Sequence, residues 1–269
     1  MSFKVMKKNI YFIIIAFVFS YCDKSIENEV ARDGFNSVGE MHNVVANHFF
    51  SKYLKTESRS SSINSNSYNF TEIDFEKMLN NPEMTYDNII TSINDVYKDS
   101  QKCKKEIDLL CFIMPSFTKD GFVKAVNDGN SVIALSVNEL IKEIPDLTDT
   151  EIKNLIAIRE YIELFFSNQI SESEFEEEKM LYKEVFFRSS DDKINTEDIF
   201  DIALNSSKYW NTFFSRNEEI NTRGWSKKDT EHLVEIAWAD VCGGIFGLYG
   251  AVAGSLIAVV TSVPGDTRQ

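Results

Sequence analysis

The chain has few prolines, few glycines and a shortage of basic residues. Its 269 residues include 4 prolines and 11 glycines, and 28 lysines and arginines stand against 42 aspartates and glutamates, a formal net charge of -14 at pH 7. This composition, with 43% hydrophobic residues, excludes collagen-like and disordered chains. We expect no nucleic-acid partner, because affinity for phosphate backbones comes from clustered Lys and Arg.

Motifs for catalysis and metal binding are also missing from the sequence. It contains no P-loop, no GxGxxG fingerprint, no GxSxG elbow and no HExxH pair. A metal site needs at least three convergent ligands, and the spacing of His232 and Glu235 provides two. We therefore expect no metal and no cofactor. An enzyme that uses His42 or His232 ranks behind a binding or structural protein.

Signals for β-strands are missing as well. There is no run of strict polar and apolar alternation, and no Asn-Gly or Asp-Gly turn between β-branched runs. Apolar residues recur instead at three- and four-residue spacing, often after capping residues, which predicts amphipathic helices. The predicted fold is all-α, a compact helical bundle around or beside a glycine-rich apolar C-terminal helix or hairpin. Helices are expected at 37–54, 71–80, 86–100, 106–114, 136–144, 152–168, 171–187, 196–210 and 226–238, and a loop is expected at 121–135.

The N-terminus has the layout of a secretory signal. Three lysines within the first eight residues precede a short apolar run at 10–19. The run is short for a bilayer span, so we expect residues 1–21 to be a signal peptide that is removed. A retained N-terminal anchor is the alternative.

Cys22 follows the apolar run and resembles the lipidated cysteine of bacterial lipoproteins. Lipoboxes favour a small residue just before the cysteine, and this chain has Tyr21 there. A lipid at Cys22 would tether the mature chain to a membrane face, whereas ordinary signal peptidase would leave the thiol unmodified. The expected location is the cell envelope, as an outer-membrane or surface lipoprotein.

The remaining cysteines are Cys103, Cys111 and Cys242. An oxidising compartment would permit disulfides, but on one helix Cys103 and Cys111 would lie about 12 Å apart, which is too far for a bond. Buried free thiols are therefore the favoured interpretation, and a disulfide stays open.

Composition divides the rest of the chain into segments. A Ser/Asn-rich stretch is typical of a flexible linker between the first helix and the main helical part. The expected order after the signal peptide is an N-terminal tether (22–35), a first helix (36–54), the linker (55–69), an α-helical domain (70–240) and a glycine-rich apolar segment (241–263).

The segment 241–263 carries no charge and contains five of the eleven glycines. Small residues recur every four positions, which on a helix forms ridges that let another helix approach closely. A continuous helix would reach about 35 Å, enough to cross a bilayer, but glycine weakens helices in water. Burial in the core and insertion into a membrane both remain open. The glycines expected to pack helices together are Gly243, Gly247, Gly250 and Gly254.

Three short motifs resemble a group of uncharacterised bacterial exported proteins. They are Gly39-Glu40-Met41-His42-Asn43, Ser206-Ser207-Lys208-Tyr209-Trp210 and the step from Ala239-Asp240 into the glycine region. That group shares a Gly-x-x-His-Asn start, a Ser-x-x-Tyr-Trp middle and a glycine-rich tail, and no activity comes with it. The resemblance implies a functional or structural role for Gly39, His42, Asn43, Trp210 and Asp240.

Two functions follow from these features. The first is an exported, lipid-anchored envelope or surface protein with a binding or structural role. The alternative is a membrane-active, toxin-like or bacteriocin-like protein that inserts through 241–263. Their partners would be a membrane through Cys22 in the first case, and a target bilayer in the second.

Overall fold

The computed structural model describes residues 37–55, 68, 70–144, 147–185, 194–215 and 226–262. The predicted signal peptide (1–21), Cys22, the tether (22–35) and most of the linker (55–69) lie outside the described residues. These assignments stay predictions.

The described residues form eleven α-helices and no β-strand, which confirms the all-α prediction. A single isolated bridge joins Leu54 and Ile73 in this part of the chain. The helices are α3 (Val38–Ser51), α4 (Phe75–Leu79), α5 (Pro82–Tyr97), α6 (Ser100–Ile113), α7 (Lys119–Asp128), α8 (Val137–Glu143), α9 (Asp149–Phe166), α10 (Glu172–Val185), α11 (Thr196–Ser215), α13 (Lys227–Gly244) and α14 (Leu248–Thr261).

Local capping signals account for several helix starts. Ser136, Thr148 and Ser226 each open a helix with a complete capping box, in which the residue three positions later bonds back to the cap. Ser37 likewise accepts a bond from the backbone N–H of Glu40 at the start of α3. Because the caps satisfy the first free N–H groups, these helices begin within three residues of the predicted starts.

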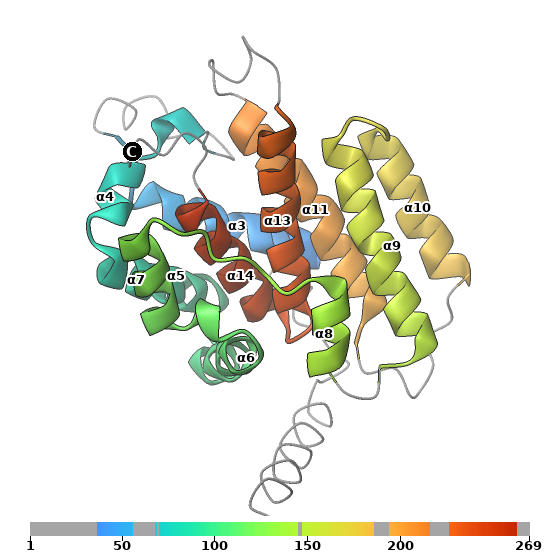
Figure 1. The fold of residues 1–269 in the computed structure, drawn as a ribbon, viewed down its shortest axis with the longest axis horizontal. Coiled ribbons are helices and arrows are strands. Elements are labelled where there is room, and N and C mark those ends of the chain that lie inside the picture. The colour runs from blue at the N-terminus through green and yellow to red at the C-terminus, as the bar shows by residue number, and fades with distance from the viewer. Residues whose placement is uncertain are drawn as a thin grey trace, which may run out of the picture.

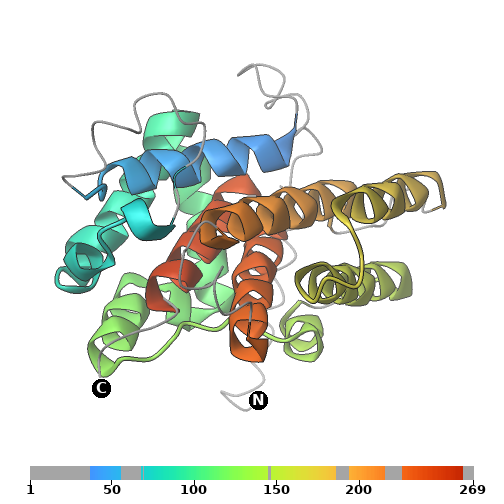
Figure 2. The ribbon, with the colours of Figure 1, turned by 90° about the horizontal axis from the view of Figure 1, so that it is seen from above.

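The glycine-rich helix α14 forms the centre of the bundle. Every one of its residues is buried, and it packs against α13, α6, α5 and α3. Figure 1 shows it in the middle of the molecule, with α5 and α7 on one side and α13 on the other, and Figure 2 shows the same arrangement from above. A helix that is apolar all round is stable in water only when its whole circumference is covered.

Glycines make the contact between α13 and α14 possible. The two helices form an antiparallel hairpin, in which a Cβ on Gly243 would lie 2.0 Å from the carbonyl oxygen of Gly250. A Cβ on Gly254 would lie 2.4 Å from the carbonyl oxygen of Ala239. These distances are too short for any side chain, so the backbones touch directly at these positions.

The hairpin differs from one continuous helix because the chain turns at Gly247. Its φ of 124° is unfavourable for residues with a side chain, and a Cβ there would meet the Glu106 carboxylate at 2.1 Å. Glu106 accepts a 2.9 Å hydrogen bond from the Tyr249 backbone N–H and so caps α14 from a neighbouring helix. Gly247 is therefore a turn residue and not part of a glycine ridge. Among the described residues, no helix is both long enough and apolar enough to span a membrane.

The expected loop at 121–135 is wrong over its first half. Thr118 caps α7 by accepting a bond from the Gly121 N–H, and α7 continues to Asp128 before Gly129 ends it with a φ of 66°. Gly121 lies in the first turn of α7. The position requires glycine, because a Cβ there would lie only 2.6 Å from the carbonyl oxygen of Pro115. The Asp-Gly pair thus marks a tightly packed helix start, and the non-helical stretch is 129–136.

We predict that Gly243→Ala destabilises the fold by about 1–3 kcal/mol, because the methyl group would overlap the Gly250 backbone. Gly244→Ala is the matched control in the same turn. Its methyl group meets the flexible end of Ile202 at 2.8 Å, and alanine favours the helix by up to about 1 kcal/mol. Urea unfolding, monitored by circular dichroism, measures the free energy of unfolding of both variants. Equal losses of stability would contradict direct backbone contact at Gly243.

Candidate functional site

A buried hydrogen-bond network surrounds His42 on α3. Its Nε2 lies 2.9 Å from Oδ1 of Asp240 on α13 and 3.1 Å from Oγ of Ser255 on α14. Its Nδ1 lies 2.9 Å from Oδ1 of Asn43, the next residue on α3. The imidazole thus contacts both arms of the glycine hairpin.

The second oxygen of Asp240 is satisfied from α11. Ser206 donates its hydroxyl and Trp210 its indole N–H, the latter at 3.1 Å, to Oδ2 of Asp240. Ser206 and Trp210 are four residues apart, so they share one helix face. With both carboxylate oxygens hydrogen-bonded, the buried charge is compensated. Helices α3, α11 and α13 meet at Asp240, and α14 joins the network through His42.

The electrostatics of the network favour a protonated imidazole. Burial lowers the pKa of His42, but the Asp240 carboxylate and the hydrogen bonds to Asp240 and Asn43 raise it more, so the pKa lies above its ordinary value. In the protonated form, Nε2–H donates to Asp240 and Nδ1–H donates to Asn43. Such charge-assisted hydrogen bonds are stronger than neutral ones.

The arrangement is not that of a catalytic triad. In a triad the carboxylate and the nucleophilic hydroxyl bind opposite nitrogens of the histidine, whereas Asp240 and Ser255 both contact Nε2 of His42. All three side chains have 0% exposure, so a substrate has no access to them in this conformation. The network therefore stabilises helix packing and offers no reaction surface.

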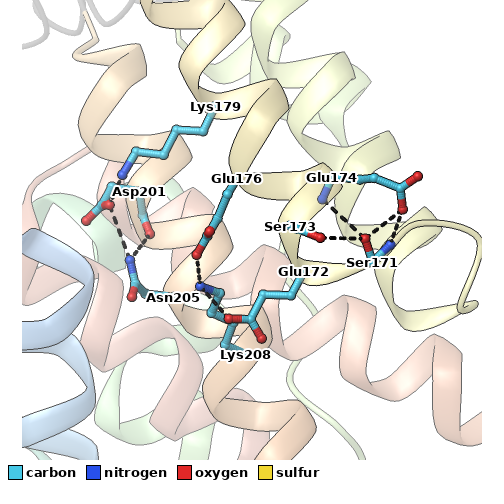
Figure 3. Close-up of polar contacts among 9 residues, drawn as sticks. All are labelled: Ser171, Glu172, Ser173, Glu174, Glu176, Lys179, Asp201, Asn205 and Lys208. Atoms are coloured by element: carbon cyan, nitrogen blue, oxygen red, sulfur yellow. Dashed lines mark hydrogen bonds and ion pairs between the residues drawn. The ribbon is translucent and has the colours of Figure 1, made fainter.

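Gly39 belongs to a second contact between the same helices. Its N–H donates to Oδ2 of Asp201 on α11 at 2.9 Å, and a Cβ there would lie 2.3 Å from Cβ of Asn205. Lys179 of α10 and the amide of Asn205 bind the other oxygen of Asp201 (Figure 3). Asp201 thus links the first turn of α3 to α10 and α11.

The acidic run at the start of α10 is balanced in a similar way. Glu172 and Glu176 both pair with Lys208 on α11, and Glu174 bonds back to Ser171 at the start of the helix (Figure 3). Its charge therefore serves helix packing and capping.

The structure brings the five singled-out residues close together. His42, Asn43, Trp210 and Asp240 form one network, and Gly39 lies one turn before His42. The hydrogen bonds of Ser206, Ser255 and Asp201 were not predicted from the sequence. Two sequence signals point to the serines. Ser206 lies four residues before Trp210, and Ser255 provides a hydroxyl inside an uncharged segment.

The other histidines and the thiols form no comparable site. His232 is half-buried, and burial together with Lys228 lowers its pKa. Cys103, Cys111 and Cys242 are free, and burial raises the pKa of each thiol. No group of His, Cys, Asp or Glu within the described ranges could hold a metal ion.

A surface groove of about 590 Å³ lies between α9 and α13. Arg159 crosses from one helix to the other, with its Nε 2.8 Å from Glu163 and its Nη2 2.6 Å from Glu235. The guanidinium also lies 5.4 Å above the ring of Trp238. The lining consists of Arg159, Glu160, Glu163, Leu164, Ser167 and Gln169 from the α9 side and Lys227, Thr230, Glu231, Val234 and Glu235 from α13.

No protein family matches the chain, and comparisons with curated proteins and with solved structures give no match. The resemblance to exported proteins therefore stays a prediction.

We predict that the stabilising effect of His42 depends on pH. Because its folded pKa is raised, its contribution is complete below the unfolded value near 6.5 and is lost as the pH rises through the folded pKa. The difference in unfolding free energy between the wild type and His42→Gln should be about 3–5 kcal/mol at low pH and smaller at high pH. Urea unfolding between pH 5.5 and 8.5 measures this difference.

His48→Gln is the control for that experiment. His48 is half-exposed and lies 3.3 Å from Asp95, so its removal should cost less than about 1 kcal/mol. A difference for His42→Gln that stays constant or grows with pH would show that the folded pKa is not raised.

Proposed function

We propose that this protein is an exported, lipid-anchored binding module of the cell envelope. One observation carries the proposal: residues 241–262 of the glycine-rich segment are all buried, in the central hairpin, so the domain keeps its most apolar part inside. A folded domain of this kind presents a charged surface to water, with the groove between α9 and α13 as its ligand-sized hollow.

The sequence supports the anchor. Cys22 follows the signal-like region, and the proposed tether of residues 22–35 can reach up to about 50 Å at roughly 3.5 Å per residue. A lipid at Cys22 would thus hold the domain at a membrane surface and leave it in water.

The alternative, insertion of the glycine hairpin into a target bilayer, is less favourable energetically. The hairpin would have to leave the bundle and break the contacts of His42 with Asp240 and Ser255. Breaking one buried ion pair costs about 3–5 kcal/mol, before the apolar surface of the surrounding helices is counted.

We predict that the full-length chain, expressed in a bacterium with lipoprotein processing, incorporates a palmitate analogue and enters the membrane fraction. Cys22→Ser should lose the label and lose membrane association. Cys111→Ser is the control, because this half-buried thiol lies inside the fold and should leave the labelling unchanged. Label retained in Cys22→Ser would refute the anchor.

The chain of residues 23–269, produced without the signal peptide and without Cys22, distinguishes the two functions. As a binding module it should be monodisperse and should leave dye-loaded liposomes intact. Leakage that rises with protein concentration would instead establish the membrane-active function.

A further inference from the structure

The non-helical segment that joins α7 to α8 lies on the surface of the bundle, and we call residues 130–136 the strap. In Figure 1 the strap runs across α14 and α13 on its way to α8. Its side chains alternate: Val132 and Ala134 are buried, whereas Ser131 is exposed and Ile133 is 63% exposed. A period of two is that of an extended β-strand.

Hydrogen bonds fix the strap to both arms of the glycine hairpin. The backbone N–H of Val132 donates to Oγ1 of Thr261 on α14 at 2.9 Å. The carbonyl of Leu135 accepts from the indole N–H of Trp238 on α13 at 2.7 Å. The strap is therefore held in place before any partner arrives, and binding to it needs little rearrangement.

Between these two contacts, one edge of the strap is free. Within the ranges that the structure describes, the backbone N–H and C=O groups of Ser131 and Ile133 make no hydrogen bond. Alternate residues of an extended chain direct these groups to the same side. The strap thus presents a short unpaired strand edge at residues 131–133.

This edge lacks the features that normally protect one. Proteins protect free strand edges with charged side chains or proline, and the sequence Asn-Ser-Val-Ile-Ala-Leu-Ser contains neither. Val132 and Ile133 are β-branched, as strands prefer. Ile133 is also the most exposed large apolar side chain among the described residues. An unprotected edge with an exposed apolar side chain favours the addition of another strand.

The charge of the chain determines which kind of strand fits. The strap is uncharged, but the whole chain has a formal net charge of -14 at pH 7. Two copies of this chain therefore repel each other, whereas a segment with basic flanks is attracted. Over the paired residues the partner segment has to be uncharged, because the strap offers no charge to pair with.

We propose that the strap is a docking site for an extended segment of another protein, uncharged where it pairs and basic in its flanks, which adds to residues 131–133 as a β-strand. Main-chain hydrogen bonds to Ser131 and Ile133 provide affinity, and an apolar side chain of the partner covers Ile133. This surface is separate from the groove between α9 and α13, and the inference does not depend on the lipid anchor.

A dye-labelled peptide of alternating threonine and valine, with a lysine at each end, is the probe. Fluorescence anisotropy at physiological salt measures its binding to the chain of residues 23–269, and saturable binding is expected. Ile133→Lys should weaken binding at least about tenfold, because it removes the apolar contact and places a repelling charge at the edge. Circular dichroism checks that the variant is folded.

Ile156→Lys is the matched control. Ile156 lies on α9 and is 42% exposed, so the variant adds the same charge to the same residue type on a helix. It should bind the peptide like the wild type. Equal weakening by both variants would mean that the acidic chain attracts the basic peptide without a site, and would overturn the inference.

Methylation of the peptide backbone tests strand addition directly. A peptide methylated on alternate amides keeps one hydrogen-bonding edge and should still bind. Methylation of every amide removes the donors of both edges and should abolish binding. Undiminished binding of the fully methylated peptide would show contact through side chains alone and would refute strand addition.

Two further outcomes contradict the proposal. No peptide binding by the folded chain would refute the docking site and leave the lipid anchor and the liposome results as they stand. A dimer that forms with rising concentration in sedimentation, and that Ile133→Lys abolishes, would identify a second copy of this chain as the occupant instead.

Discussion

The contact between His42 and Asp240 is the constraint on which the rest of the fold depends. It joins residues 198 positions apart. Ser206 and Trp210 of α11 bind the same carboxylate and Ser255 of α14 binds His42, so α3, α11, α13 and α14 meet in one network. Apolar packing alone would tolerate small rotations or shifts of these helices. The buried Asp240 carboxylate does not tolerate such shifts, because any movement of a helix leaves a charge or a hydrogen-bond donor unpaired.

The network and the glycine hairpin depend on each other. Gly254 contacts Ala239 with no room for a Cβ, and the next residues in the chain are Ser255 and Asp240. This close approach is what lets both side chains reach the same nitrogen of His42. At the two ends of α14, Glu106 binds the Tyr249 N–H and Thr261 accepts a bond from the Val132 N–H. The apolar helix α14 is thus held in register by the polar contacts of Tyr249, Ser255 and Thr261.

The sequence predicts the helices well because their signals are local. Three- and four-residue spacing and caps such as Thr148 act within one turn, so the all-α fold follows from them. The partners of His42 and Asp240 lie far apart in the chain, and no local signal connects them. Gly247 was expected to pack helices but turns the chain, and Gly121 was expected to begin a loop but packs in a helix. The two kinds of glycine look alike in sequence. The groove depends on how α9 lies against α13, which spacing does not determine.

Helix α13 explains how a sealed core and an open surface can belong to one domain. Asp240 on its inner face binds His42. Glu231 is nine residues, or about two and a half turns, earlier, so it lies on the opposite face and lines the groove. Trp238, about two turns after Glu231, lies on the same side of the helix as Glu231. Its indole N–H donates to the Leu135 carbonyl, and its ring lies under Arg159. Helix α13 thus carries the buried ion pair on one face and one wall of the groove on the other. The motif residues that hold α13 against α3 and α11 therefore also hold the helix that lines the groove.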